Sequence, residues 1–274
     1  MIVSRVVLVF AALGSTGFAA VNAISGAAVN APAERDVAFS VVDDCDLTTV
    51  EAVASRHPGT RQVIVAATSS FESTSGVVEV AVRTSGGTWR CQHGAMAAQF
   101  GRAGTRPLFE RRSGDDTTPA GVFPLGRVTA WDGQVFSIFG NSHDPGVIAS
   151  YRDVRPEDCW GATKNTDRYQ HLVNRPSCAG PSDEWLPRFG DVYSHAAVIG
   201  ANLDPISGDA PGEIPYAAAI FLHRNSYTSA GIARPTSGCV SLGYEDLVDT
   251  LRLIDPRLDP QFAIGPLDWL RTTA

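Results

Sequence analysis

A histidine and a cysteine in the last quarter of the chain have the types and spacing for covalent chemistry. His223 ends the apolar run 217–222, and Cys239 follows behind Gly238 in a turn of small residues. An imidazole can deprotonate a neighbouring thiol, and such a turn lets main-chain N–H groups face the atom that the thiol attacks. The pattern predicts an acyl-transfer site with Cys239 as nucleophile and His223 as general base. The alternatives are a buried structural cysteine and a histidine satisfied in the core.

The residues around this pair complete the predicted site. The main-chain N–H groups of Ser237, Gly238 and Cys239 are the expected donors to a tetrahedral oxyanion. Asn225 and Thr236 flank the polar run between histidine and cysteine, and we expect both to contact the substrate. No grouping of Cys and His residues has metal-ligand spacing, so we expect neither a metal nor a cofactor.

Two motifs resemble a known family. His223 followed by Thr236-Ser237-Gly238-Cys239-Val240-Ser241-Leu242 resembles the catalytic motif of the YkuD-type L,D-transpeptidases. Ser237 stands where the common form of the motif has a second histidine, so the branch with a small residue before Gly-Cys is the closer match. The Thr-Pro-x-Gly-x-Phe element at 118–123 also resembles this family, in which it shapes the floor under the catalytic strand.

The resemblance implies a fold and a reaction. The fold would be mostly β, a compact sandwich or barrel with a few short helices. Cys239 would attack the amide between a diamino acid and a terminal D-Ala of a peptidoglycan stem peptide, forming a thioester. An amine of a second stem would resolve it into a cross-link between the third residues of two stems, whereas water would make the enzyme an L,D-carboxypeptidase. The family's susceptibility to acylation by carbapenems would also apply to Cys239.

The resemblance also implies a role for Arg224. Its main-chain carbonyl would orient the imidazole of His223, and its side chain would either face a substrate carboxylate or be solvated. Two other functions remain open. One is a cell-wall-binding module that kept the fold and lost the chemistry, which the departure from the motif at Ser237 supports. The other is a general cysteine peptidase.

The N-terminus has the pattern of a secretory signal peptide. Arg5 precedes the apolar run 6–13, and small residues follow. We expect a signal peptide over 1–23, with alternative cleavage sites up to residue 33, then a linker over 24–40 and the catalytic domain over 41–272. The protein would act outside the cytoplasm of a bacterium, in the cell wall or periplasm, without stable membrane insertion after cleavage. An uncleaved anchor is the alternative.

Charge and cysteines add two constraints. The chain has 274 residues, a net charge of −7 and no basic stripe, so nucleic acid is not an expected partner. In an exported protein paired thiols oxidise, and an odd count leaves one over. The simplest pairing joins Cys45 to Cys91 and Cys159 to Cys178, which leaves Cys239 free. Other pairings remain open.

Hydrophobic patterning predicts the elements around the site. We expect a helix over 48–56, capped by Thr48 with Glu51, and a helix over 244–254. Expected strands cover 62–68, 77–84 (half-buried), 88–92, 192–200, 217–222 and 260–265, the last one an edge strand.

The predicted strand 192–200 places Tyr193 and His195 on one side. His195 then either lines the site or is a half-buried strand histidine. The polar segment 144–187 has no periodicity. It is expected to be a disulfide-stapled insertion that covers one end of the substrate groove, or else a surface loop.

Overall fold

A computed structural model describes residues 44–141, 143–163, 166, 168–203 and 216–273. These residues belong to one compact unit, 40–274. The expected signal peptide (1–23), linker (24–40) and first residues of the expected domain (41–43) lie outside the described residues.

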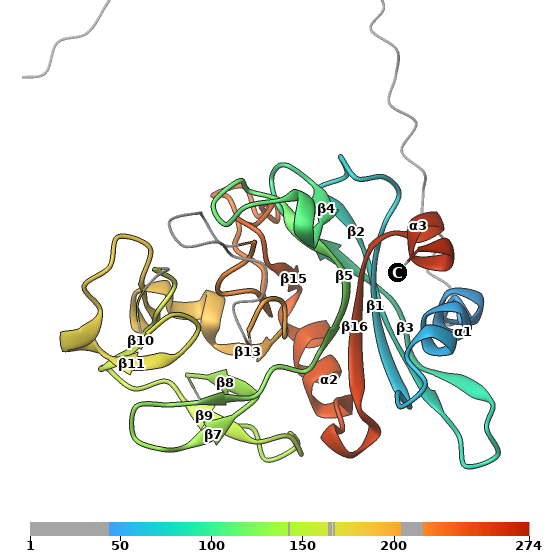
Figure 1. The fold of residues 1–274 in the computed structure, drawn as a ribbon, viewed down its shortest axis with the longest axis horizontal. Coiled ribbons are helices and arrows are strands. Elements are labelled where there is room, and N and C mark those ends of the chain that lie inside the picture. Colours follow the sequence, from blue (N-terminus) through green and yellow to red (C-terminus); the bar gives the residue numbers. More distant parts are fainter. Residues whose placement is uncertain (1–43, 142, 164–165, 167, 204–215, 274) are drawn as a thin grey trace, which may run out of the picture. The chain divides into compact units, whose positions relative to one another are not determined.

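The unit is mostly β and is organised around an eleven-stranded mixed sheet (Figure 1), in the order β4-β5-β16-β1-β2-β3-β15-β14-β13-β8-β9. Four neighbouring pairs are parallel: β4 with β5, β16 with β1, β15 with β14, and β8 with β9. In this order the strands are Thr105–Pro107, Thr118–Pro124, Pro260–Pro266, Gln62–Thr68, Ser75–Arg83, Trp89–Gln99, Val240–Leu242, Phe221–Arg224, His195–Val198, Ile138–Gly140 and Tyr151–Asp153.

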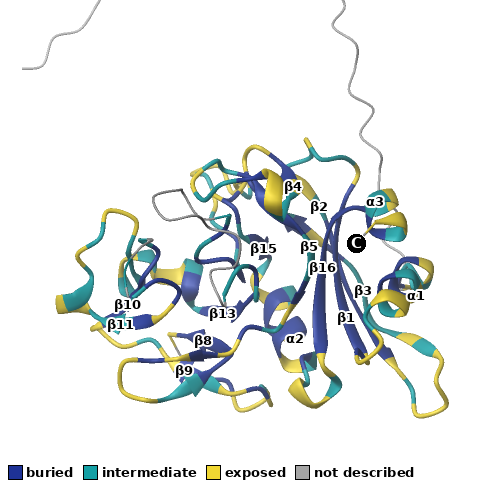
Figure 2. Cartoon of the chain, in the orientation of Figure 1, coloured by how far each residue is buried: buried dark blue, intermediate teal, exposed yellow. Residues whose placement is uncertain are grey.

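The two faces of the sheet are covered by different elements. Helix α2 (Tyr244–Leu253) lies against β13, β14 and β15, as its helical spacing of apolar residues predicted. Helices α1 (Leu47–Arg56) and α3 (Leu267–Thr272) lie together beside β1, β3 and β16 (Figure 1). This arrangement buries every residue of β1 and β16 (Figure 2).

Burial on both faces corrects the expectation for β2. Its alternating pattern predicted one solvated face with Glu79 on it. Val78 and Val80 do face the main core, but Val77 and Ala81 pack into a second cluster with α1. Glu79 is only 8% exposed and accepts a hydrogen bond from the Asp46 N–H at 2.9 Å. Local alternation cannot reveal that a distant helix covers the polar-looking face.

Two further predictions are corrected at element ends. Helix α1 is capped by Asp46, whose side chain accepts from the Thr49 N–H at 3.2 Å, so the predicted Thr48–Glu51 cap is wrong. The C-terminal strand β16 is central, not an edge strand, because it lies parallel to β1 and antiparallel to β5. Pro260 is accommodated at its first position.

The polar segment after β8 is an ordered lobe. It contributes β9 to the main sheet and forms a three-stranded sheet in the order β11-β10-β12 (Leu172–Asn174, Asp158–Trp160, Glu184–Trp185). The 3-10 segment η3 (Leu186–Tyr193) then leads into β13. A buried cluster joins the lobe to the sheet through Trp160, Leu172 and Phe221. The lobe therefore has its own strands and a core shared with β14.

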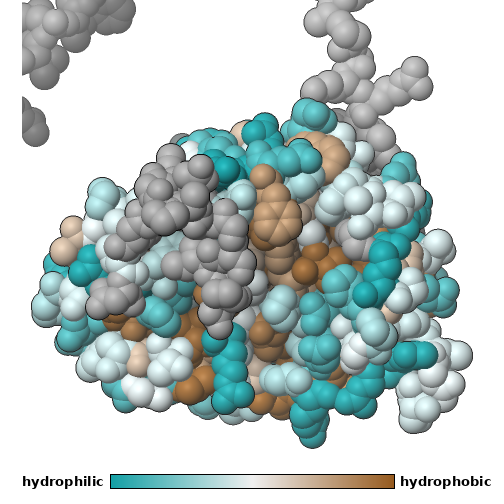
Figure 3. Space-filling model, viewed as in Figure 1, coloured by the Kyte–Doolittle hydropathy of each residue, from teal (hydrophilic) through white to brown (hydrophobic). Residues whose placement is uncertain are grey.

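The remaining short elements lie in connections. They are a two-stranded ribbon, β6 with β7 (Val128–Thr129, Val135–Phe136), and the 3-10 turns η1 (Leu108–Glu110), η2 (Arg175–Ser177) and η4 (Pro256–Leu258). Polar and small residues cover most of the face shown in Figure 3, with apolar residues in separate areas.

The two disulfides are those of the simplest pairing. Cys45–Cys91 joins the start of α1 to β3, and Cys159–Cys178 staples the lobe. Cys239 is the free cysteine of the described residues. None of the helices in the described ranges has the length and apolar character needed to cross a membrane.

Candidate active site

Parallel pairing of β14 with β15 brings His223 and Cys239 together. His223 is the third residue of β14, and Cys239 immediately precedes β15, where Leu222 is paired with Val240. Both residues line one cavity of about 490 Å³. The predicted strand over 217–222 begins later than expected, at Phe221, because Ala219 has a left-handed backbone with φ 53°.

The imidazole of His223 is held by the main chain. Its Nδ1 lies 2.8 Å from the Arg224 carbonyl oxygen, as the resemblance implied. A carbonyl only accepts, so Nδ1 carries the proton and Nε2 is left as the acceptor. Burial lowers the pKa of His223 to about 4, although the hydrogen bond to Arg224 acts in the opposite direction. The ring is therefore neutral at neutral pH and able to accept a proton.

The thiol of Cys239 is held by two backbone groups. Its Sγ donates to the Ala219 carbonyl at 3.4 Å and accepts from the Phe221 N–H at 3.4 Å. Burial raises the pKa of Cys239 to about 12; the charge of Glu184 raises it further, while the Phe221 N–H and Arg111 lower it. The resting site thus holds a neutral thiol and a neutral imidazole. Attack on a carbonyl requires the proton to move to His223 as the new bond forms.

Hydroxyl groups brace the turn before the thiol. Thr236 Oγ1 and Thr118 Oγ1 donate to the Cys239 carbonyl at 2.6 and 3.1 Å. Gly238 has φ 143°, and a Cβ there would lie 3.1 Å from the Thr117 carbonyl oxygen. The turn therefore favours glycine at this position. Thr118 opens the Thr-Pro-x-Gly-x-Phe element, which forms β5 and supports the turn.

The expected oxyanion donors need one correction. The Gly238 N–H donates to Thr236 Oγ1 at 3.1 Å, so it is already engaged. The N–H groups of Ser237 and Cys239 make no hydrogen bond to another described residue. Ser237 Oγ accepts from Arg102 at 2.6 Å. Two of the three predicted N–H donors are therefore left for an oxyanion. Thr236 lines the cavity, and its hydroxyl also holds the turn through Gly238 and Cys239.

Of the two roles predicted for His195, the structure agrees with that of a strand histidine, since the residue lies on the face of the sheet opposite to His223. Its neighbour Ala196 pairs with His223, so the alternation of β13 turns His195 to the opposite face. There its buried ring lies 5.6 Å from the ring of Tyr244 on α2. His195 does not line the cavity around Cys239.

Arg224 and Asn225 also lie away from the cavity. The Arg224 guanidinium stacks over Tyr244 at 5.0 Å and pairs with Asp191 at 3.3 Å. The buried amide of Asn225 lies 2.7 Å from Ser241 Oγ. Neither residue lines the cavity, so the predicted contacts of their side chains with substrate stay predictions. Arg224 ends β14 and Asn225 follows it, so their contacts hold the end of that strand.

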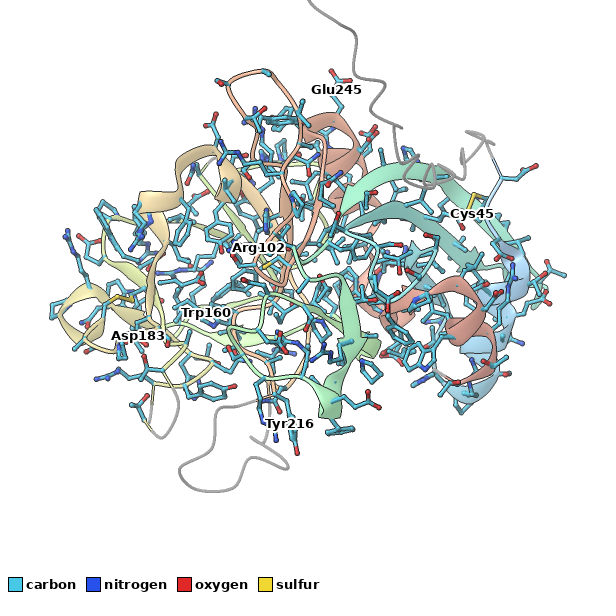
Figure 4. All side chains as sticks on the ribbon, turned by 90° about the horizontal axis from the view of Figure 1, so that it is seen from above. Cys45, Arg102, Trp160, Asp183, Tyr216 and Glu245 are labelled. Carbon is cyan, nitrogen blue, oxygen red and sulfur yellow. A yellow bond between two sulfur atoms is a disulfide. The ribbon has the colours of Figure 1, made fainter. Side chains whose placement is uncertain are left out.

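An arginine wall of the cavity was not predicted. Arg102, Arg111 and Arg234 line it, and Figure 4 labels Arg102. The Arg111 guanidinium is buried and donates to the Thr117 carbonyl at 2.9 Å and to Asp115 Oδ1 at 3.3 Å. Arg-rich composition of the loop 101–121 was the available signal, but it did not indicate which arginine turns inward.

The opposite wall comes from the lobe and carries an acid. Glu184 on β12 accepts from the Tyr193 hydroxyl at 3.0 Å, and both residues line the cavity. Burial raises the pKa of Glu184 to about 7, against the lowering effects of Tyr193 and Arg188. The Tyr193 ring meets His223 edge-on at 5.5 Å. No sequence pattern pointed to Glu184, since it lies in a polar segment without periodicity.

Neither a metal-binding group nor a known relative adds to the description of the site. The described residues hold no group of three His, Cys, Asp or Glu side chains able to bind a metal ion. In comparisons with known proteins, no family model, curated protein or solved structure matches the chain.

Proposed function

We propose that the protein is an exported cysteine acyltransferase of the L,D-transpeptidase kind, acting on peptidoglycan stem peptides. The observation that carries the proposal is the imidazole of His223, fixed through Nδ1 by the Arg224 carbonyl, in one cavity with the free thiol of Cys239. The two disulfides agree with export, because such bonds persist in oxidising compartments.

In the proposed first half-reaction, Cys239 Sγ attacks the carbonyl carbon of the amide between the diamino acid and the terminal D-Ala. His223 Nε2 takes the thiol proton, and the N–H groups of Ser237 and Cys239 donate to the oxyanion. The C–N bond then breaks, His223 returns the proton to the leaving amine, and D-Ala departs. The product is a thioester on Cys239.

In the second half-reaction, an amine of another stem attacks the thioester carbonyl and loses a proton to His223. The C–S bond breaks, and the thiol regains its proton as the new amide forms. Water in place of the amine gives an L,D-carboxypeptidase from the same site. The arginine wall supports a donor that ends in a free carboxylate, since guanidinium groups bind carboxylates well.

One observation favours a second candidate, a wall-binding module without chemistry. In the described structure the thiol bonds to Ala219 and Phe221, not to His223, and the pKa of Cys239 is raised to about 12 by burial. Such a module would retain the protein on cell walls without forming a thioester.

The test is turnover of a purified stem tetrapeptide, with and without an acceptor stem, followed by mass spectrometry. The proposal predicts D-Ala release and a peptidyl thioester on Cys239 in the wild type. Cys239→Ala should abolish both and keep the fold, as judged by circular dichroism. If Cys239→Ala releases D-Ala as fast as the wild type, the proposal is wrong. Binding to purified sacculi without turnover would instead favour the module.

A further inference from the structure

The carboxylate of Glu184 is placed at the nucleophile without a cation of its own. One oxygen accepts from the Tyr193 hydroxyl at 3.0 Å, and Tyr193 is buried. Glu184 makes no ion pair with a described residue, although the charge of Arg188 acts to lower its pKa. Its side chain still reaches the cavity that holds Cys239 and His223. A partly buried carboxylate without a cationic partner is costly, so purely structural packing does not explain it.

When the cavity is empty, this carboxylate also opposes ionisation of the Cys239 thiol. Its negative charge disfavours a thiolate at Cys239, whereas Arg111 on the other wall favours it. The thiol is thus influenced by two charges of opposite sign, which come from different parts of the chain and line the same cavity. A bound cation at Glu184 would remove the opposing effect and leave that of Arg111.

We propose that Glu184, oriented by Tyr193, is a specificity-determining residue that binds a positively charged amine of the substrate. The inference deepens the proposed function and rests on it for the identity of the amine, the side-chain ammonium of the diamino acid. A ligand with this ammonium at Glu184 and a carboxylate at the arginine wall would occupy the cavity that Cys239 lines. Binding of the amine then both orients the substrate and lifts the repulsion on the thiol.

The first test needs no peptidoglycan activity. Methanethiosulfonate reagents modify a thiol when Sγ attacks the sulfenyl sulfur: an S–S bond forms, methanesulfinate leaves, and the thiol proton passes to the buffer. The 2-aminoethyl reagent is cationic, the 2-sulfonatoethyl reagent anionic and the methyl reagent neutral. Modification rates of Cys239 are measured by intact mass without reductant, and each charged rate is divided by the neutral rate.

The expected wild-type result is a cationic ratio well above the anionic ratio. In Glu184→Gln, which keeps an acceptor for Tyr193, the cationic ratio should fall about five- to tenfold, as for loss of a partly buried charge pair. Glu157→Gln removes the same charge from an exposed position in the same lobe and should change neither ratio. An unchanged cationic ratio in Glu184→Gln would overturn the inference. The neutral rate reports whether each variant keeps an intact site.

The second test uses a stem tetrapeptide with its side-chain amine free or acetylated. In the wild type acetylation should raise KM, and in Glu184→Gln the two peptides should have the same KM. If turnover occurs and Glu184→Gln still discriminates between them, the inference fails and the proposed function stands. If no peptide turns over but the reagent ratios shift as expected, the amine site stands and the proposed function fails.

Discussion

The two walls of the cavity around Cys239 come from different parts of the chain and are built differently. The sheet wall consists of neighbouring strand ends, β14 and β15, and carries His223 and Cys239. The lobe wall consists of β12 and η3 and carries Glu184 and Tyr193. Main-chain contacts hold the reactive groups of the sheet wall, whereas a side-chain hydrogen bond between Tyr193 and Glu184 orders the lobe wall.

This difference suits the sheet wall to performing the reaction and the lobe wall to selecting the substrate. Groups fixed by backbone atoms are rigid and retain their geometry when nearby side chains change, as an acyl-transfer site requires. The groups of the lobe wall are instead held by side chains, so replacing them should change the fit of a substrate more than the positions of the reactive groups. We therefore expect changes in the sheet wall to affect the rate of every substrate, and changes in the lobe wall to affect which substrate is chosen.

The largest expected effect is at the base. Replacing His223 with Gln leaves a side chain that cannot take the thiol proton. The thiol, whose pKa burial raises to about 12, then has no local acceptor. Acylation of Cys239 should slow by about 100- to 10,000-fold, measured by stopped-flow with an amide or lactam acyl donor. A loss of less than tenfold would remove His223 from the reaction. His195→Gln, on the other face of the sheet, is the matched control and should retain the wild-type rate.

The turn at Gly238 should show the next largest effect. Gly238→Ala introduces a Cβ 3.1 Å from the Thr117 carbonyl oxygen at a backbone φ of 143°. The displaced turn should misplace the N–H groups of Ser237 and Cys239 and lower kcat by about 100-fold with little change in KM. A rise in KM at unchanged kcat would mean that the turn contributes to binding alone. Gly86→Ala, at an exposed turn where the added Cβ would lie no closer than 3.7 Å to another atom, serves as the comparison.

The lobe disulfide is expected to matter for stability and selection. Replacing both Cys159 and Cys178 with Ser should lower the free energy of unfolding by about 2–4 kcal/mol, measured in urea. The cation preference at Glu184 should weaken, while the neutral reagent should still modify Cys239 near the wild-type rate. Equal loss of reactivity towards all reagents would show that the two walls are not separable.

The smallest effect concerns the pH dependence of stability. Burial raises the pKa of Glu184 from 4.5 to about 7, so between these values the folded protein keeps a proton that the unfolded chain releases. The free energy of unfolding should therefore fall as pH rises from about 4.5 to 7, by about 1–3 kcal/mol from this group.

Glu184→Gln removes that loss. Measured by urea unfolding, the free energy of unfolding of the variant should rise relative to that of the wild type as the pH increases from 5 to 8. Glu157→Gln should follow the wild-type pH dependence. If the Gln variant has the wild-type slope instead, Glu184 does not titrate in this window.

The sheet wall was largely predictable from the sequence, and the lobe wall was not. The apolar run points to His223, and the small-residue turn and the odd cysteine count point to Cys239, because these signals are local or depend on parity. Glu184 gives no such signal. It reaches the cavity only because β12 pairs with β10 and the lobe packs on Phe221, which are long-range contacts.

The position of His195, away from the cavity, has a specific physical cause. Period-two alternation across 192–200 puts Tyr193 and His195 on one side, but η3 continues through Tyr193, and the strand begins only at His195. The turn rotates Tyr193 towards His223 and leaves His195 facing α2. The central position of β16 was missed for a similar reason, since the pairing of β16 with β1 joins distant parts of the chain.

The most direct test of the central claim, that Cys239 is an activated nucleophile, is intact-mass spectrometry of the non-reduced chain before and after incubation with a carbapenem. If Cys239 is the nucleophile, the chain will contain two disulfides and gain a single adduct, which peptide mapping assigns to Cys239. The adduct should be absent in Cys239→Ala and strongly slowed in His223→Gln. An unmodified chain whose Cys239 is also inert to alkylation, or an adduct on another residue, would contradict it.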